Sequence, residues 1–470
     1  MKKTKMKKTV KAVVLSSAIA IVLASCASTP KFNQEMYDAA YNSEDYATCA
    51  AMLEGKKPGN NAIKNSLDVN MLKYYADDYA GSGKGFVETK QQFQDVTAGM
   101  TPAKVMQAAL VSENSVEYSG PVYERILSYS MRAIDSIQLD AIDSAVGVMN
   151  DYTGTYKDIV ETVVRQQKEL EEASEGESDD KEKALEVFKK AGLTIDLGQF
   201  TAPAKYKSSY ETSPLMSYLG TVVYAANDDF DHAKDSSLML KKDNADVDVA
   251  DTVSVPAGKG RLEVLALSGT IGKREEFATD LVAVGAVYGI PVMFKMTYPQ
   301  FNAANANHSI NAVEVTLSNG ETKVASLVED FDKAVEDDVK SKQAGAYARS
   351  LTRNIVKNSV AIGSVVAADI TRQKAPNDMA KNIAEAAYTA AVIALPKAMP
   401  LIIDAEKADV RQGEYFPHMA SAAGFTVDAG TYTVTVKYLA KDNSVVAEKT
   451  IENVVVNNGK VSVTVASCAK

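Results

Sequence analysis

The spacing of apolar residues changes near the middle of the chain. From Thr29 to about Lys242 the apolar positions recur every three or four residues, which is typical of amphipathic helices. Beyond about residue 250 the chain contains alternating runs that are typical of strands. This change predicts a helical first half and a second half that contains sheets.

Short polar turns divide the first half into pairs of helices. After each turn the next helix opens on an apolar or aromatic residue, and a small residue follows three positions later. Residues three apart share a helix face, so a small side chain there lets the preceding helix approach closely. We therefore predict helical hairpins that resemble tetratricopeptide (TPR) repeats, with a plain helical bundle as the alternative. The four predicted openings are Tyr46/Cys49, Phe86/Thr89, Ala141/Ser144 and Phe230/Ala233, and Gly81–Gly85 is the predicted turn before Phe86.

One stretch of the helical half is almost entirely charged. Residues 168–183 carry few large apolar side chains and can bury little surface. We expect a flexible, solvated insertion here, and we favour it over an acidic binding tail.

The second half combines strands with long helices. Arg261–Leu267 and Pro291–Thr297 are predicted strands. The alternating runs 310–317 and 322–326 flank Asn319-Gly320, a strong short-range signal for a β-hairpin. These segments predict a mixed α/β domain in the middle of the chain.

Two helices are expected next, over about 328–368 and 378–395. Pro396 and Pro400 should end the second helix, because proline lacks the N–H that an α-helix needs. The apolar stretch Ala384–Ile403 is expected to be a buried helix rather than a membrane span, since it contains charges and those prolines.

The last segment alternates again. Thr431–Tyr438 turns at residues 441–444 into 445–447, and residues 454–456 and 461–465 flank a second turn, which predicts two antiparallel hairpins. The fold class is therefore α+β, with TPR-like helical hairpins, a mixed α/β central domain and C-terminal β-hairpins. The predicted segments are a signal peptide at 1–25, a helical domain at 26–245, a mixed domain at 250–405 and a β module at 406–470.

The N-terminus predicts the location of the protein. Six lysines precede the uncharged run Ala12–Ala24, which is too short to span a bilayer but has the length of a signal-peptide core. The run ends in Leu23-Ala24-Ser25-Cys26, which resembles the lipobox of bacterial lipoproteins. After cleavage Cys26 would carry two or three acyl chains such as palmitate, enough for a stable anchor. We predict an extracytoplasmic protein anchored to the cell membrane or the outer membrane, with a plain secretory signal as the alternative.

The composition and net charge limit the classes of partner that the protein can bind. The formal charge is −10, and loss of the first 25 residues, which hold six Lys and no acid, takes it to −16. Such an acidic chain is a poor partner for nucleic acid. Cys49 and Cys468 could form a disulfide, but we favour a buried thiol in a helix and a thiol in a frayed tail.

No catalytic or metal-binding motif is evident. Gly269-Thr-Ile-Gly272-Lys273-Arg274 is too short for a phosphate-binding loop and lacks its Ser or Thr. The three histidines are scattered and are expected at the surface or at helix caps. We therefore predict no cofactor and no metal, and we leave an enzymatic role open but disfavoured.

One basic constellation stands out in this acidic chain. Arg349, Arg353 and Lys357 lie at i, i+4 and i+8 of a predicted helix and should form one stripe. Lys273 and Arg411 are further candidates. Guanidinium groups can hold carboxylate or phosphate in a fork geometry, so the stripe predicts an anion or partner site. The alternative, which we favour, is pairing with acids of the chain itself, such as Asp409 or those of residues 329–338.

Several loose motifs, taken in order, resemble a family of uncharacterised bacterial envelope lipoproteins. They are Tyr118-x-Gly-x-x-Tyr-Glu-Arg125, Pro214-Leu-Met-Ser-Tyr-Leu219, Gly269-Thr-Ile-Gly-Lys273, Ala348-Arg-Ser-Leu-Thr-Arg-Asn-Ile-Val-Lys357 and Ala408-Asp-Val-Arg411 before Phe416-Pro417. The resemblance implies no enzymatic activity and suggests a role in envelope assembly.

These observations predict a membrane-anchored, non-enzymatic scaffold that binds envelope proteins or peptides. The alternatives are an anion-binding or enzymatic α/β domain that uses the basic stripe, and a purely structural envelope component. An apolar groove lined by Tyr74, Tyr123 or Tyr218 would favour the scaffold. A closed pocket with basic groups near Lys273 and Arg349 would favour the anion site.

Overall fold

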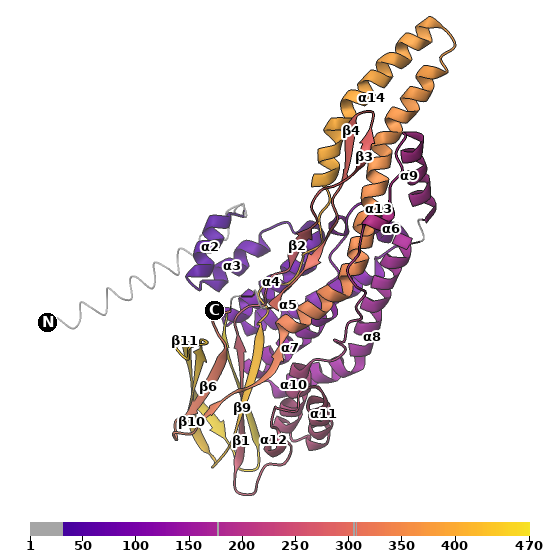
Figure 1. Cartoon of the computed structure of the whole chain (residues 1–470). Coiled ribbons are helices and arrows are strands. Elements are labelled where there is room, and N and C mark those ends of the chain that lie inside the picture. Colours follow the sequence, from indigo (N-terminus) through magenta and orange to yellow (C-terminus); the bar gives the residue numbers. More distant parts are fainter. Residues whose placement is uncertain (1–31, 176–177, 304–305, 307) are drawn as a thin grey trace, which may run out of the picture. The chain divides into compact units, whose positions relative to one another are not determined.

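The computed structural model of the chain (Figure 1) describes residues 32–175, 178–303, 306 and 308–470. The predicted signal peptide at 1–25 and the predicted acylation site Cys26 lie outside the described residues. The fold is α+β, with a helical N-terminal half and a C-terminal half that holds the strands, as the sequence pattern predicts. The chain divides into two compact units, Met1–Lys57 and Pro58–Lys470.

The described part of the first unit is one helical hairpin, made of α2 (Gln34–Asn42) and α3 (Tyr46–Glu54). Asp45 caps α3 through its side chain. Tyr37 and Cys49 are buried, and the Cys49 thiol donates to the carbonyl of Tyr37 at 3.8 Å. Cys49 is therefore the buried thiol in a helix that the sequence predicts.

The second unit begins with most of the remaining helices. Three antiparallel pairs, α4 with α5, α7 with α8 and α10 with α11, pack side by side, and α5 also packs on α7. The bounds are α4 (Ala62–Tyr75), α5 (Tyr79–Ala98), α6 (Pro102–Leu110), α7 (Val122–Gln138), α8 (Ile142–Glu175), α9 (Ser178–Lys190), α10 (Pro214–Ala226), α11 (Phe230–Asp243) and α12 (Ala250–Val253), with 3-10 turns at Gly59–Asn61, Glu113–Ser115 and Leu197–Gln199.

All four helix pairs turn through the same backbone geometry. The residue two positions before each second helix is acidic and has a left-handed φ near 60°. The next residue donates its N–H to the carbonyl five residues earlier, which closes the end of the first helix. In three of the pairs that residue is an Asp that also caps the second helix. The left-handed residues are Glu44 (61°), Asp77 (59°), Asp140 (53°) and Asp228 (61°).

This geometry tests the predicted helix openings. Tyr46 and Phe230 are the first residues of α3 and α11, as predicted. α8 opens at Ile142, one residue after the prediction, and α5 opens at Tyr79, seven residues before the predicted Phe86. In each pair the small residue three positions after the observed first residue of the second helix is fully buried. The predicted spacing of three residues therefore holds even where the predicted helix start was wrong. These small residues are Cys49, Ser82, Ala145 and Ala233.

The glycines that misled the prediction for α5 lie inside that helix. A Cβ atom on Gly85 would stand 2.0 Å from the side-chain oxygen of Asn70 on α4. The glycine is therefore needed for close helix packing rather than for a turn.

The expected flexible insertion at 168–183 is largely helical in the described residues. α8 continues to Glu175 and α9 begins at Ser178. Lys168 and Glu172 form an ion pair of 3.3 Å at i, i+4, and the charged residues of this stretch are good helix formers. A solvated helix needs little apolar surface, which is why composition alone did not predict it.

The strands of the second unit build two four-stranded sheets and a long two-stranded ribbon. The strand orders are β12-β1-β9-β8 and β11-β10-β6-β7, and the ribbon pairs β2 with β5 and β3 with β4. The bounds are β1 (Gly260–Ser268), β2 (Glu275–Ala278), β3 (Val282–Val287), β4 (Ile290–Phe294), β5 (Thr297–Gln300), β6 (Ala312–Leu317), β7 (Thr322–Val324), β8 (Ser326–Asp330), β9 (Met419–Val427), β10 (Gly430–Leu439), β11 (Val445–Val456) and β12 (Val461–Cys468).

The two sheets stack as a sandwich whose first sheet is also covered by helices. Leu262 and Val264 of β1 and Phe425 of β9 share a core with Val436 of β10 in the second sheet. Leu265, on the opposite face of β1, joins the core formed with the helices, and α7 and α10 contact β12. Both four-stranded sheets mix strands from before and after residue 406, so strand pairing crosses the predicted domain boundary.

The predicted hairpins 310–326 and 431–447 are confirmed as β6–β7 and β10–β11. The predicted second C-terminal hairpin is wrong, because β12 leaves β11 and pairs in parallel with β1 in the other sheet. Val465 and Cys468 are buried in different cores on the two faces of β12, and only the covered sheet can bury both faces. Cys468 is therefore a buried strand residue and does not lie in a frayed tail.

The remaining elements form a structure that we call the arm: α9, the β3–β4 hairpin, residues 355–373 of α13 (Phe331–Gln373), and α14 (Asp378–Asp404). Phe188, Phe294 and Ile362 belong to its own core. α13 and α14 run antiparallel and project beyond β4 and α9 (Figure 1).

Two expectations for α14 were wrong. The helix continues through Pro396 and Pro400 to Asp404, and both prolines are exposed, so the carbonyls that they leave unpaired can reach solvent. Nor is α14 a buried helix, because only Ala384, Leu395 and Met399 of its 27 residues are buried.

Candidate functional site

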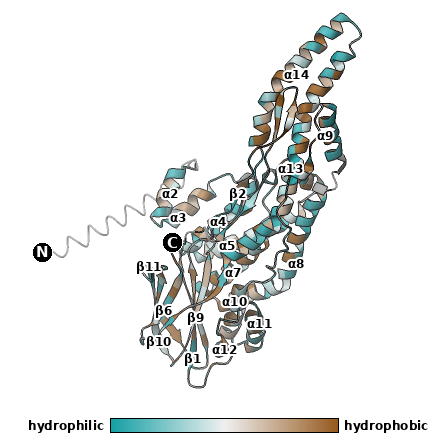
Figure 2. Cartoon of the chain, in the orientation of Figure 1, coloured by the Kyte–Doolittle hydropathy of each residue, from teal (hydrophilic) through white to brown (hydrophobic). Residues whose placement is uncertain are grey.

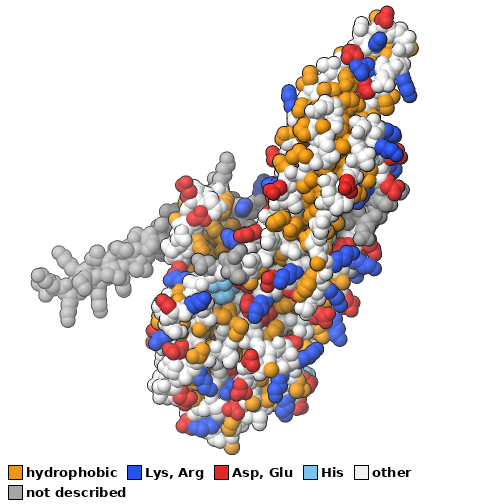
Figure 3. All heavy atoms as spheres, in the orientation of Figure 1, with side chains coloured by type: hydrophobic (Ala, Val, Ile, Leu, Met, Phe, Trp, Pro, Cys, Tyr) orange, Lys and Arg blue, Asp and Glu red, His pale blue; other side chains and the backbone are white. Residues whose placement is uncertain are grey.

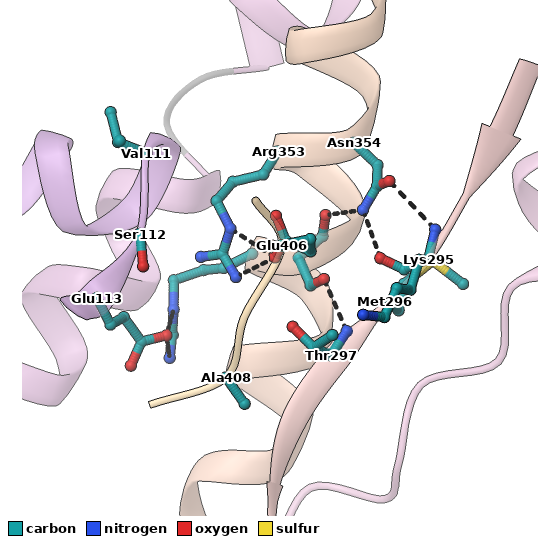
Figure 4. A network of polar contacts seen from close by, with 12 residues as sticks. Val111, Ser112, Glu113, Lys295, Met296, Thr297, Arg353, Asn354, Glu406 and Ala408 are labelled. Atoms are coloured by element: carbon teal, nitrogen blue, oxygen red, sulfur yellow. Dashed lines mark hydrogen bonds and ion pairs between the residues drawn. The ribbon is translucent and has the colours of Figure 1, made fainter. Parts of the chain in front are cut away.

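The predicted basic stripe lies on α13, and acids of the same chain neutralise it. The Arg349 guanidinium pairs with Glu113 at 2.9 Å, and Arg353 pairs with Glu406 (Figure 4). Lys357 approaches the second oxygen of Glu406 at 3.2 Å. The pairing that we favoured is present, but through Glu113 and Glu406 rather than through the acids named from the sequence.

The Arg353–Glu406 pair is closed to ligands. The two side chains are 2% and 1% exposed, and Arg353 also points Nη1 at the carbonyl of Ala109. Asn354, the next residue, bridges α13 to the backbone of Lys295 (Figure 4). This cluster holds the base of the arm to the rest of the unit.

The other two predicted residues have different roles. Lys273 is exposed and lies 3.4 Å from Glu414, a surface pair of little energetic weight. Arg411 is saturated by Asp409 and by three backbone carbonyls. Although burial alone would raise the pKa of Asp409, its hydrogen bonds to Arg411 hold that pKa below its usual range.

Arg349 and Arg411 do meet in one cleft, whereas Lys273, Arg353 and Lys357 do not line it. The cleft has a volume of about 140 Å³ and lies between α6, α8 and α13. Its polar lining includes Arg274, Lys342 and Gln166, none of which we singled out from the sequence as site residues. No motif marks these three positions, because the fold brings them together from distant segments.

Arg274 is a deeply buried cation of the cleft wall, with a side chain 4% exposed. Burial opposes its charge, but Tyr123 and Asp338 nevertheless hold its pKa above the usual range. Glu124 lies near it, and burial raises the pKa of that carboxyl to about 7. Tyr118 donates to Glu124 at 2.9 Å, which completes a buried polar layer behind the cleft.

A second cluster was missed because its residues are far apart in sequence. The rings of His308 and His418 stack with centroids 3.8 Å apart, and His308 hydrogen-bonds Asp332 at the start of α13. Burial and the neighbouring His308 lower the pKa of His418 to about 4, so its ring is neutral at pH 7. Only His232 lies at a helix cap, beside Asp229. Within the described part of the chain, no group of three or more His, Cys, Asp or Glu could hold a metal ion.

The three tyrosines do not form the exposed aromatic groove that would favour the scaffold, although Tyr123 borders a cleft beside α8 and α13. Tyr74, Tyr123 and Tyr218 are each 1% exposed and belong to the main core. The exposed apolar surface lies instead on the arm.

The outer face of α14 is apolar over most of its length. Met379, Ile383, Ile393 and Leu401 are 76%, 67%, 57% and 69% exposed. Figure 2 shows hydrophobic residues along α14, and Figure 3 shows hydrophobic side chains on the surface of this part of the arm. α14 is long and apolar enough to cross a membrane by length and composition. A surface of this kind commonly marks an interaction site.

Comparison of the chain with models of protein families, with curated proteins and with solved structures finds no match. The resemblance to envelope lipoproteins therefore stays a prediction from the sequence.

Proposed function

We propose that the protein is a lipid-anchored, non-enzymatic scaffold of the bacterial cell envelope, and that the outer face of α14 binds an amphipathic helix of a partner protein. The lipobox at Cys26 supports the anchor. The observation that carries the binding role is the exposure of Met379, Ile383, Ile393 and Leu401 on one face of a projecting helix.

The charges of the arm argue against insertion into a bilayer from its tip. Residues 358–368 of α13 and 386–396 of α14 contain no Asp, Glu, Lys or Arg. Such a band is about 16 Å long at 1.5 Å per residue, against about 30 Å of hydrocarbon. Insertion would also carry the charged tip across, at about 2.5 kcal/mol or more for each charge at the bilayer centre. The tip charges are Asp369, Arg372, Lys374, Asp378, Lys381 and Glu385.

The side chains on the outer face of α14 allow a second helix to pack against it. Ala386, Ala390 and Ala394 are exposed at i, i+4 and i+8, between Ile383 and Leu401. A row of small residues flanked by large apolar ones lets a second helix approach closely and interdigitate. A lipid-binding face would gain more from large apolar side chains than from alanine.

The charges near this face indicate the chemistry of the partner. Asp369 and Glu385 are both paired with Arg372. Lys374, Lys381 and Lys397 are exposed, and none of them forms an ion pair with a described residue. The exposed Asp378 is the one acid among the tip charges that likewise forms no ion pair with a described residue, so the unpaired lysines outnumber it. A partner helix with acidic residues beside its apolar stripe would complement these lysines.

A photo-crosslinking amino acid at position 390, introduced in cells that make the protein, tests the proposal. We expect one crosslinked partner protein, with the crosslink mapped to an amphipathic segment that carries acids, and we expect Ile393→Glu to abolish it. The same crosslinker at the exposed Lys234 of α11 is the matched control. Crosslinks to a second copy of the chain, to lipid only, or equally from both positions would overturn the binding role.

The anchor is tested separately. Cys26→Ala should release the protein from the membrane fraction, because the acyl chains would be lost. Unchanged fractionation would refute the anchor and leave the crosslinking result to be judged on its own.

A further inference from the structure

We propose that the cleft between α6, α8 and α13 binds a small amphiphilic carboxylate, with Arg274 and Gln166 as donors to the carboxylate. This site goes beyond the scaffold role and depends on neither the anchor nor the outer face of α14.

Two buried donors of the cleft wall have no partner among the described residues. They are Nε of Arg274 and Nε2 of Gln166, and both residues line the cleft. A buried donor without an acceptor is unfavourable by about 1–3 kcal/mol. Both groups are hydrogen-bond donors, so a ligand atom that pairs with them must be a hydrogen-bond acceptor.

The charges of the wall specify a negative acceptor. Arg274 and Lys342 both pair with the same oxygen of Asp338, at 2.7 and 2.8 Å. The other ion pairs that involve the lining, Arg349 with Glu113, Arg411 with Asp409 and Lys104 with Glu117, are matched one to one. One carboxylate thus serves two cations. Glu124 also lies near Arg274, but burial raises its pKa to about 7 and it is only partly charged at pH 7, so a local surplus of positive charge remains beside the unpartnered Nε.

Much of the remaining lining is apolar. It consists of Val105 and Ala108 of α6 and of Val163 and Leu170, which flank Gln166 on α8. A volume of about 140 Å³ admits a short carbon chain but not a bulky headgroup. A charged end at Arg274 and a chain along this apolar lining describe a short-chain carboxylic acid or a molecule that ends in one.

The site differs from the predicted basic stripe in its residues. Arg353 and Lys357 form ion pairs with Glu406 outside the cleft. Of the three stripe residues, only Arg349 lines the cleft. The new contributors are Arg274, the last residue of the rejected phosphate-loop motif, and Gln166, on a helix from the other half of the sequence.

Calorimetric titration of the purified full chain tests the site, with hexanoate as the probe. We expect a dissociation constant below about 1 mM, within the affinity that eight heavy atoms can supply. Hexan-1-ol, hexylamine and acetate should each bind at least about tenfold more weakly, since each lacks the charge, its sign or the chain.

Three variants locate the binding. Gln166→Leu should weaken hexanoate about tenfold, because it removes one hydrogen bond to a charged group. Arg165→Leu, on the same helix but outside the cleft lining, should leave the affinity unchanged. Lys342→Gln should weaken binding by removing the surplus charge, and it avoids the risk that a change of the buried Arg274 disturbs folding.

Absence of hexanoate binding would overturn the proposal. So would equal binding of hexanoate and hexan-1-ol, or equal effects of Gln166→Leu and Arg165→Leu.

Discussion

The buried Arg353–Glu406 pair shows why single residues were hard to place from the sequence. The i, i+4, i+8 spacing predicts one cationic stripe, and the stripe is real. Its partners lie 236 and 53 positions away from Arg349 and Arg353, at Glu113 and Glu406. Helical periodicity says nothing about contacts over such distances, so charge alone could not separate a ligand site from a structural pair.

Removal of one member of this pair should be strongly destabilising. Arg353→Met leaves Glu406 buried with only Lys357 beside it, and we expect a loss of about 3–5 kcal/mol in the free energy of unfolding. The double variant Arg353→Met/Glu406→Leu should recover most of that loss. Urea unfolding measures both.

Lys273→Met is the matched control, because its pair with Glu414 is solvent-exposed. It should change stability by less than about 0.5 kcal/mol. A loss for Arg353→Met as small as the loss for Lys273→Met would contradict a structural role for the buried pair.

A different residue, Asp135, should make the stability depend on pH. It is buried on α7, accepts a hydrogen bond from Ser82 at 2.9 Å, and burial raises its pKa to about 8. Between about pH 4 and pH 8 the folded chain holds a proton that the unfolded chain releases. The free energy of unfolding should therefore fall as pH rises through this window, by at most about 1.4 kcal/mol per pH unit.

Asp135→Asn removes this titration and should reduce the slope between pH 5 and pH 8 by up to about 1.4 kcal/mol per pH unit, measured by urea unfolding at each pH. Part of the slope should remain, because burial also raises the pKa values of Glu124 and Glu329 to about 7. The exposed Asp143→Asn makes the same charge change at the start of α8 and should leave the slope as it is. An unaltered slope in Asp135→Asn would show that this carboxyl is not the source.

At the scale of elements, the sequence predicted the features that are determined by residues close together in the chain. The strands around Asn319-Gly320 were found because alternation and turn residues act within a few positions. The start of α5 was predicted wrongly because Gly81–Gly85 has the composition of a turn, although these glycines lie inside the helix and allow close helix packing. The exposure of α14 was missed for a related reason, since an apolar helix does not reveal whether the fold covers it.

The shared turn geometry makes a prediction for one helix pair. Ala141 occupies the position at which the other three pairs place a capping Asp. Ala141→Asp should supply the missing cap to the N–H of Ser144 and stabilise the second unit by about 1 kcal/mol. Asp78→Ala should cost about as much, by loss of the bond that Asp78 accepts from Gly81. Thermal and urea unfolding would show opposite shifts, and shifts of the same sign would contradict the common geometry.

At the scale of the whole molecule, the sandwich could not be predicted from neighbouring segments. β1 pairs with β12 about 200 residues later in the chain, and β9 lies on its other side. The sequence showed that both strands exist, but it indicated a local hairpin for β12. Pairing over such a distance is decided by which sheet can bury both faces of the strand.

Two truncations test this organisation. A chain that begins at Pro58 should keep the cooperative unfolding of the second unit, because the division between units falls there. A chain that ends at Lys460 lacks β12, exposes the edge of β1 and should be insoluble or unfold without cooperativity. Circular dichroism and light scattering distinguish the outcomes. A soluble, cooperative chain without β12 would refute its role in closing the sheet.

The length of α13 has a mechanical consequence. Its 43 residues form one continuous rod of about 65 Å. Lys342 and Arg349, in the N-terminal half of this helix, line the cleft, while the stretch beyond Ile355 supports α14. A tilt of five degrees at the root would displace the far end by about 6 Å over that length. An occupant at either end that prefers one tilt would alter affinity at the other, and thermodynamic reciprocity requires the two effects to be equal.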